Sequence, residues 1–376
     1  MSDSSPDPYL APATPQPVLT YTPYPTKYVP ASDLSTPVER APSADLNGLN
    51  IHNPLTGLPV RDPSLLDRRP LAIKIANSPD YVRPQSGLSL ADVAYEYYIE
   101  WGDTRFTVVF YSNDAERVGP VRSGRFLDEH IARMYHSFLF FKGADPREMN
   151  HFRSIDISDL LIVAGIGSCP PFFVGPYRRD AYNNVFFNTT KWSACAERKN
   201  LDNSPQTLRH GFFSDDAQES ALVVSRIYSF YSVYNYNYWE YDPAAQYYVR
   251  YQESNDRVGG KPEAYALLTD DLTKLPVTAA NVVLLFVPHV FTNTYNAEDE
   301  VFRIDLIDYG NAYVFRDGVA IPAHWKRTDI DQPILLTTLT GHPIYLRPGQ
   351  TFYQVMGTTS TYTQNGVEWR FVFQTP

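Results

Sequence analysis

Short runs of hydrophobic residues, many of them alternating with polar ones, recur along the chain after residue 50 and predict β-strands. The first run covers residues 70–77, and we expect it to form a core strand. Two more runs, 92–100 and 104–112, are joined by Trp101-Gly102-Asp103. Because a Gly-Asp pair suits a tight loop, these two runs are predicted to form a β-hairpin.

A helical spacing follows at residues 123–135, where the apolar positions fall on one face. These positions are Phe126, Leu127, Ile131, Met134 and Tyr135. Ser123 is the predicted N-cap of this helix. A short buried strand at 137–141 and a second short helix at 146–152 are expected next.

The second half of the chain reads mostly as strands. They are predicted at 223–231, 236–241, 246–252, 281–291, 302–308, 312–315 and 319–325. Between the last two lies Asp317-Gly318, a pair that tolerates the positive φ angles of a hairpin turn. The polar stretch from about residue 201 to 218 is the best candidate for a domain boundary.

Residues 1–50 have a different composition, with ten prolines and almost no apolar periodicity. Such a segment cannot bury enough surface to offset the entropy of ordering, so we expect an extended tether. At roughly 3.1 Å per residue it could reach on the order of 150 Å. The prediction is an α+β protein: a disordered tether at 1–50, a mixed α/β N-terminal domain at 51–213 and a mainly antiparallel β C-terminal domain at 222–376.

Composition narrows the possible functions. The net charge of −10 argues against a nucleic-acid partner, which requires a basic face. No apolar stretch approaches the roughly 18 residues of a membrane span, and no signal peptide is visible, so the chain either follows a removed signal or is cytosolic. The 28 tyrosines and 21 phenylalanines favour a β-rich fold, although a carbohydrate-binding surface would use the same residue types.

The two cysteines, Cys169 and Cys195, could form a disulfide in an exported protein or remain buried thiols in a cytosolic one. Two cysteines without nearby histidines do not make a zinc site, and phosphate-binding and dinucleotide-binding glycine motifs are absent, so no metal or cofactor is expected. The sequence around Ser168 and Cys169 resembles a nucleophile elbow only loosely, which gives nucleophilic catalysis little support.

Arg122 and Arg125 form the strongest candidate site, because they bracket the predicted start of a helix, where an anion is favoured. Two guanidinium groups there could bind a carboxylate or phosphate. The alternative is structural: Arg125 would pair with Asp128 or Glu129, and Arg122 with Glu96.

Glu96 and Glu100 could be read as paired catalytic carboxylates. On a strand, however, four residues span about 13 Å, beyond the roughly 5 to 9.5 Å used by glycosidases. If the hairpin turns at Gly102-Asp103, Glu100 lies opposite Arg105, and a cross-strand ion pair accounts for both.

Several short motifs occur in an order and spacing that resemble the YerB-like lipoprotein family. They are Asn53-Pro54-Leu55-Thr56-Gly57, Arg69-Pro70, Arg83-Pro84-Gln85-Ser86-Gly87-Leu88, Ala91-Asp92, Tyr95-Glu96, Thr104-Arg105-Phe106, Gly119-Pro120-Val121-Arg122-Ser123, Gly318, His324-Trp325-Lys326 and Leu346-Arg347-Pro348-Gly349-Gln350-Thr351. The resemblance covers roughly residues 52–356. It implies bacterial envelope lipoproteins with an N-terminal and a C-terminal domain, whose activity is not established.

The family's polar pattern falls on seven positions of this chain. They are Arg83, Glu96, Arg105, Arg122, Arg125, Arg179 and Asn184. The chain departs from the pattern at Asn183, where the family is expected to have histidine, and it lacks the lipobox cysteine that would carry a lipid.

Three functional hypotheses follow. The leading one is a non-enzymatic extracytoplasmic binding protein, tethered to the membrane, that holds an anionic group of an envelope polymer or peptide around Arg83, Arg122 and Arg125. The second is a hydrolase of envelope glycan or peptide, with Glu96 or Asp128 as general acid or base. The third is a scaffold for another protein, which exposed aromatic patches at Tyr236, Tyr238 or Trp325 would favour.

Overall fold

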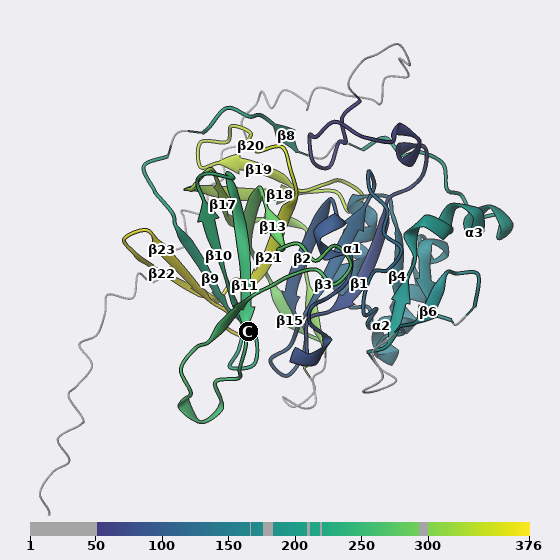
Figure 1. The fold of residues 1–376 in the computed structure, drawn as a ribbon, viewed down its shortest axis with the longest axis horizontal. Helices are drawn as coiled ribbons and strands as arrows, with labels where there is room; N and C mark the ends of the chain where they lie inside the picture. The colour runs from purple at the N-terminus through teal and green to yellow at the C-terminus, as the bar shows by residue number, and fades with distance from the viewer. Residues whose placement is uncertain (1–50, 166, 176–182, 209–210, 219, 293–299) are drawn as a thin grey trace, which may run out of the picture.

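The structure is a computed structural model that describes residues 51–376 except 166, 176–182, 209–210, 219 and 293–299. The predicted tether at 1–50 lies outside the described residues. Two large β-sheets carry most of the fold, with three α-helices on the N-terminal side of the chain (Figure 1).

The larger sheet has ten strands and includes segments from both halves of the chain. Their order is β19 (Leu335–Thr338), β18 (Val319–Arg327), β17 (Asp308–Arg316), β14 (Asn281–Val287), β21 (Thr351–Gly357), β2 (Val93–Tyr98), β3 (Thr104–Phe110), β1 (Leu71–Ala76), β4 (Phe138–Phe141) and β5 (Leu161–Val163).

The smaller sheet has seven strands, all from the C-terminal half. They run β12 (Tyr265–Leu267), β11 (Tyr247–Glu253), β10 (Tyr236–Asp242), β9 (Arg226–Phe230), β23 (Glu368–Val372) and β22 (Thr361–Asn365), with β13 (Thr278–Ala279) also paired to β11. Three two-stranded pairs complete the strands: β15 (His289–Phe291) with β16 (Phe302–Ile304), β20 (Tyr345–Leu346) with β8 (Phe212–Phe213), and β6 (Phe172–Val174) with β7 (Val185–Phe187).

The α-helices are α1 (Phe126–Met134), α2 (Pro146–Ser154) and α3 (Trp192–Arg198). Short 3-10 turns lie at Pro63–Asp67, Asp80–Val82, Leu88–Leu90, Ser158–Leu160, Thr189–Lys191 and Val258–Gly260. The predicted fold class is confirmed: the N-terminal domain is a mixed sheet with helices, and the C-terminal domain is mostly antiparallel β.

One parallel strand pair joins the two domains into a continuous sheet. Strand β2 of the N-terminal domain pairs with β21 of the C-terminal domain, with Val93 opposite Thr351 and Tyr97 opposite Val355. In Figure 1 these two strands lie in the middle of the molecule. The domains therefore share a sheet, and are not two separate bodies joined by a linker.

Both predicted hairpins are present, but the first turns at Trp101-Gly102, one residue before the predicted Gly102-Asp103, so that Arg105 lies opposite Tyr97 and not opposite Glu100. Trp101 and Gly102 have φ angles of 51° and 89°, and Asp317 and Gly318 have 52° and 72°. Positive φ at both central positions is the requirement of the tight turn that matches the twist of paired strands.

The structure corrects some element boundaries. Helix α1 begins at Phe126 and its N-cap is Arg125, not Ser123, because the Asp128 carboxylate accepts the Arg125 backbone N–H at 2.7 Å. The single strand predicted at 281–291 is divided at Pro288 into β14 and β15, since proline has no N–H to donate to a sheet.

Aromatic side chains fill the space between the two large sheets. The Trp239 ring of the smaller sheet meets Phe352 of the larger one at a centroid distance of 4.9 Å, and Trp369 meets Tyr313 at 5.2 Å. This packing buries about 150–250 Å² for each aromatic residue and is the main hydrophobic contribution to the sandwich.

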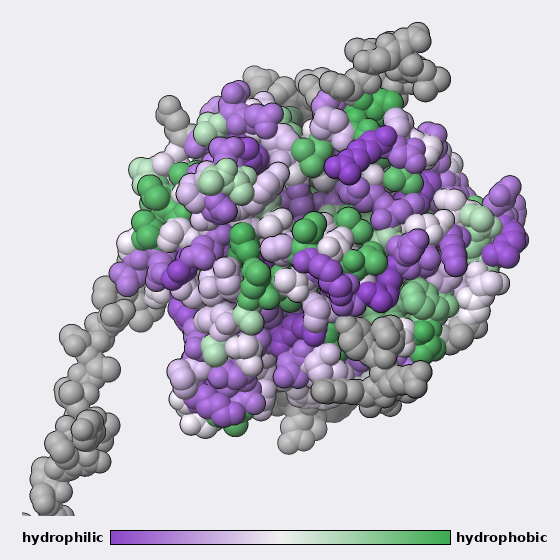
Figure 2. Space-filling model, viewed as in Figure 1, coloured by the Kyte–Doolittle hydropathy of each residue, from purple (hydrophilic) through white to green (hydrophobic). Residues whose placement is uncertain are grey.

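The aromatic patches of the scaffold hypothesis are largely inside the protein. Tyr236 and Trp325 are completely buried, and Tyr238 is half-buried and stacks on Tyr251 at 4.6 Å. The face of the molecule seen in Figure 2 shows hydrophobic residues only as small patches among hydrophilic ones.

A buried ion pair links the smaller sheet to the shared sheet. The Arg250 guanidinium of β11 donates to both oxygens of Glu96 on β2, at 3.0 and 2.9 Å, and both side chains are fully buried. The amide of Gln354 on β21 donates to the same carboxylate at 2.9 Å. Glu96 is therefore part of the joint between the two sheets.

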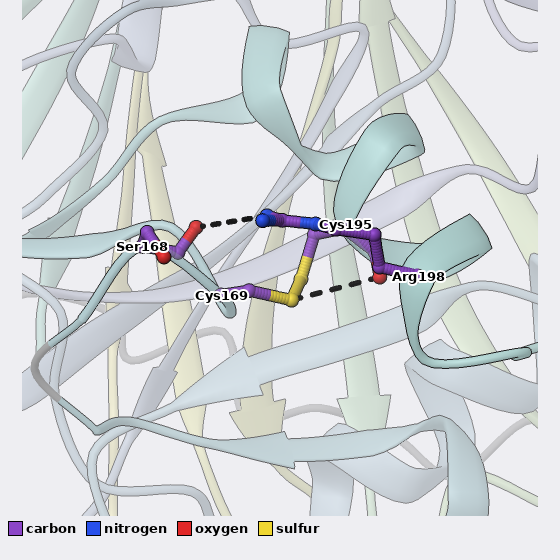
Figure 3. Close-up of a disulfide and its surroundings, with 4 residues drawn as sticks. All are labelled: Ser168, Cys169, Cys195 and Arg198. Carbon is purple, nitrogen blue, oxygen red and sulfur yellow. Dashed lines mark hydrogen bonds between the residues drawn. A yellow bond between two sulfur atoms is a disulfide. The ribbon is translucent and has the colours of Figure 1, made fainter.

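Cys169 and Cys195 form a disulfide, with their Cα atoms 5.4 Å apart (Figure 3). The bond ties the segment before β6 to helix α3, where Arg198 also donates to the Ser168 carbonyl at 3.5 Å. A cysteine sulfur in a disulfide is not a thiolate, so Cys169 cannot be a nucleophile in this state.

Removing the positive partner of the Glu96–Arg250 pair should be strongly destabilising. We expect Arg250→Met to lower the free energy of unfolding by about 3 to 5 kcal/mol, because it leaves the Glu96 carboxylate buried without its counter-ion. The double variant E96M/R250M should recover much of this loss. Urea unfolding followed by tryptophan fluorescence measures both.

The matched control is Arg303→Met, whose side chain is 58% exposed and pairs with Asp305 on the surface. It should cost less than about 1 kcal/mol. An Arg250→Met variant as stable as this control would contradict the role given to the buried pair.

Loss of the disulfide should also be measurable. The paired replacement C169S/C195S is expected to reduce the free energy of unfolding by roughly 2 to 4 kcal/mol, because the bond restricts the unfolded chain. The wild type in reducing buffer should unfold at the same urea concentration as this variant. If reductant shifted the midpoint of the variant as well, the effect would not come from this bond.

Candidate functional site

Three arginines meet at the start of helix α1. The segment 122–125 is held to the sheet by the backbone N–H of Arg122, which donates to the Lys74 carbonyl of β1 at 2.9 Å. Arg105, on the neighbouring strand β3, donates from Nη1 to the Ser123 carbonyl at 2.9 Å. Arg125 is the N-cap of the helix. Strand order and the helix start together bring these side chains to one place.

The three positive charges lie close enough together to change the pKa of Arg105. Burial, and then the nearby guanidinium groups of Arg125 and Arg122, lower this pKa to about 9. Two like charges beside a side chain that is only 7% exposed disfavour its charged form. The arrangement is electrostatically costly unless an anion lies close by.

Carboxylates of the protein supply part of that negative charge. Glu100, in the hairpin turn, lies 2.6 Å from Arg125 Nη2, and Glu148 on α2 lies 3.6 Å from Arg125 Nη1. Two pairings therefore differ from those predicted. Glu100 pairs with Arg125 instead of Arg105, and Glu129 pairs with Arg133 and His151 instead of Arg125.

Glu148 neutralises Arg125 only partly. Burial raises the pKa of its carboxyl to about 7, although Arg125 acts in the opposite direction. Among the described residues, the buried oxygen Oε1 of Glu148 has no hydrogen-bond partner. Burial likewise raises the pKa of Asp103, the other carboxyl beside Arg105 and Arg122. Beside its guanidinium groups the cluster therefore contains two carboxyls whose pKa is raised by burial, and one buried carboxyl oxygen without a hydrogen-bond partner among the described residues.

A fully buried polar layer lies directly beneath the arginines. Asp128 accepts hydrogen bonds from Tyr97 and, at 2.5 Å, from Thr107, and its carboxylate lies 3.3 Å from Lys74 Nζ. Burial lowers the pKa of Lys74 to about 7. Neither Lys74 nor Asp128 has any exposed side-chain surface, so this layer supports the site from below and does not touch a ligand.

The remaining predicted site residues lie in other contacts. Arg83 forms an ion pair with Glu253 of β11, beside a cleft with a volume of about 260 Å³. Glu96 belongs to the buried joint with Arg250. Asn184 is half-buried and accepts the Gly175 backbone N–H at 2.7 Å, and Arg179 lies outside the described residues.

These positions bear on the hydrolase hypothesis. A general acid or base must reach the proton that it transfers, and both Glu96 and Asp128 have zero side-chain exposure. In this structure neither carboxyl can contact a substrate. Asn183, where the resemblance led us to expect histidine, is also buried, and its amide donates to the Tyr81 hydroxyl at 3.0 Å.

Sequence reasoning missed Glu148 as a member of the site. The available signal was Asp145-Pro146 followed by Glu148, since an acidic residue three positions after an Asp N-cap is typical of a helix start. That signal predicts the helix, but not that Glu148 faces Arg125 from a different element.

Glu148 should make stability depend on pH in a defined direction. Because its folded-state pKa of about 7 is raised above 4.5, the stabilisation gained by protonating it is present at low pH and is lost as pH rises through about 7. The Glu148→Gln side chain stays neutral at all pH values. The free energy of unfolding of this variant, relative to that of the wild type, should therefore increase by about 2 to 3 kcal/mol from pH 5 to pH 8. Urea unfolding at several pH values measures this difference.

The exposed Glu116 offers the control, and Glu116→Gln should change stability equally at both pH values. A pH-independent difference between Glu148→Gln and the wild type would show that Glu148 is ionised throughout, and would contradict the assignment.

Comparison with known proteins matches both halves of the chain. The family described as protein of unknown function (DUF3048), N-terminal domain, matches residues 55–202, and its C-terminal counterpart matches residues 227–353.

No helix among the described residues is both long and apolar enough to cross a membrane, and no group of three metal-binding side chains occurs in those residues.

One curated relative and one solved structure carry the same name. The putative lipoprotein YerB of Bacillus subtilis is 28% identical over 286 residues, which cover 73% of this chain and 78% of that protein. The crystal structure of YerB from Bacillus subtilis superposes with a TM-score of 0.63 at 24% identity, covering 81% of this chain and 96% of that chain. With the two family matches in the expected order, these similarities show that the chain belongs to the YerB-like family of two-domain proteins of unknown function.

Proposed function

We propose that this protein is an extracytoplasmic binding protein of the bacterial envelope that holds an anionic group of its ligand at Arg105, Arg122 and Arg125. The observation that carries the proposal is the convergence of three guanidinium groups on the segment 122–125, close enough for Arg125 and Arg122 to lower the pKa of Arg105. An anion placed there would relieve the repulsion that the arginines exert on one another.

Phosphate is the anionic group that fits this cluster best. Its oxygens can accept hydrogen bonds from several guanidinium groups at once, whereas a carboxylate has only two oxygens to offer. The helix end itself contributes less, because Asp128 already accepts the Arg125 backbone N–H. The guanidinium groups, and not the helix terminus, would hold the ligand.

Three observations support the location. The relative in Bacillus subtilis is a putative lipoprotein, and the disulfide between Cys169 and Cys195 suits an oxidising compartment. The proline-rich composition of residues 1–50 suits a spacer between a membrane anchor and the folded domains.

The proposal is tested by calorimetric titration of the full chain with inorganic phosphate and with a glycerol phosphate oligomer. Arg122→Gln is the first variant, because it removes one positive charge and leaves the Arg125 ion pairs intact. We expect it to weaken binding of the oligomer about tenfold or more, and the double variant R122Q/R125Q to abolish it.

Arg303→Gln is the matched control, since it removes an exposed arginine elsewhere and should bind like the wild type. Thermal unfolding confirms that each variant is folded. The proposal fails if the wild type binds neither phosphate probe, or if folded Arg122→Gln binds as tightly as the control. Preference for succinate over phosphate would overturn the choice of phosphate.

A further inference from the structure

An open cleft lies where the N-terminal domain meets the edge of the smaller sheet. Its lining comes from the 3-10 turn and loop at residues 80–84 on one side, and from β11, β12 and the residues after each strand on the other. The arginine cluster takes no part in it. The cleft therefore needs its own explanation.

Strand β12 forms the outer rim of this cleft, and no strand of the described residues pairs with its other side. The backbone bonds to β11 alternate: Ala264 O accepts from Ser254, and Leu268 N donates to Arg250 O. In an antiparallel pair with this register, the backbone groups of Tyr265 and Leu267 point away from β11. An extended chain could add to β12 through those groups.

The rim also offers apolar contact. Leu267 is 43% exposed, and Ala266 is exposed beside it. Leu268 continues the apolar lining into the cleft, where it is almost fully buried. Alternate side chains of an added strand would lie against this surface.

The charged residues of the cleft indicate what kind of chain fits. Two carboxylates, Asp80 and Glu253, line it with a single guanidinium, Arg83. Arg83 is already paired with Glu253, which leaves the exposed Asp80 as the excess charge. A positively charged side chain would complement this arrangement, and an acidic one would be repelled.

We propose that the cleft between residues 80–84 and β12 binds an extended segment of another polypeptide, which adds as a strand to β12 and places a lysine or arginine side chain near Asp80. Main-chain hydrogen bonds to Tyr265 and Leu267 would give affinity, and Asp80 would give the preference for a basic residue. This site is independent of the arginine cluster, so either proposal can fail without the other.

The test uses the full chain and two fluorescent peptides of alternating valine and threonine, one with a central lysine and one with a central glutamate. Leu267→Pro removes the outward N–H and leaves the bonds between β12 and β11 in place. Leu267→Ala removes the side chain and keeps that N–H. We expect Leu267→Pro to weaken binding of the lysine peptide about tenfold or more, and Leu267→Ala by no more than about threefold.

Asp80→Asn should remove the preference for the lysine peptide, and the exposed Asp159→Asn is its control. The inference is overturned if the wild type binds neither peptide, if Leu267→Pro folds and binds normally, or if Leu267→Ala loses binding as completely as Leu267→Pro. Equal binding of both peptides would refute the role of Asp80. Concentration-dependent dimers that Leu267→Pro abolishes would show that a second copy of this chain occupies the edge instead.

Discussion

The buried pair of Glu96 and Arg250 is the interaction on which the architecture depends. The Arg250 guanidinium lies between three aromatic rings, 5.2 Å from Phe106, 5.3 Å from Trp239 and 5.0 Å from Phe352, with no exposed surface. A charge in such surroundings is tolerated only when it is paired and hydrogen-bonded. Since its partner is on β2, the smaller sheet has one position on the larger sheet in which this charge is satisfied.

Among the charged residues of the N-terminal domain, the degree of burial distinguishes those that support the fold from those that could bind a ligand. Lys74 and Asp128 are fully enclosed and satisfy one another. One layer further out, Arg125 retains 11% of its side-chain surface, and its partner Glu100 also acts on Arg105. Charges that remain partly accessible are the ones available to a ligand.

Local patterns were sufficient for many elements. The hairpin turns at Gly102 and Gly318 and the apolar face of α1 depend on residues close together in sequence, and the sequence predicts them. Strand β21 could not be found in this way, because it is buried on both faces and so lacks alternation, and because Gln354 interrupts its apolar run. Arg250 could not be recognised as a buried residue, because its partner Glu96 is 154 residues away in the sequence.

The candidate site shows the same division. The positions of Arg122 and Arg125 at a helix start follow from the spacing of apolar residues, which is why they could be singled out. The carboxylate partners of Arg125 could not be predicted, because Glu100 lies in a turn and Glu148 on a different helix. Arg83 belongs to the same series of family motifs as Arg122 and Arg125, but in the folded protein it pairs with Glu253 of the second domain.

The parallel pairing of β2 with β21 has a consequence for the order of folding. The Glu96 and Gln354 side chains that meet across this pair are 258 residues apart in sequence. Until β21 has been synthesised, the N-terminal domain presents an unpaired edge at β2. Such an edge can pair with other chains, so an incomplete molecule is exposed to misassembly until β21 is in place. Completion of the sheet therefore closes an edge that the N-terminal domain cannot close by itself.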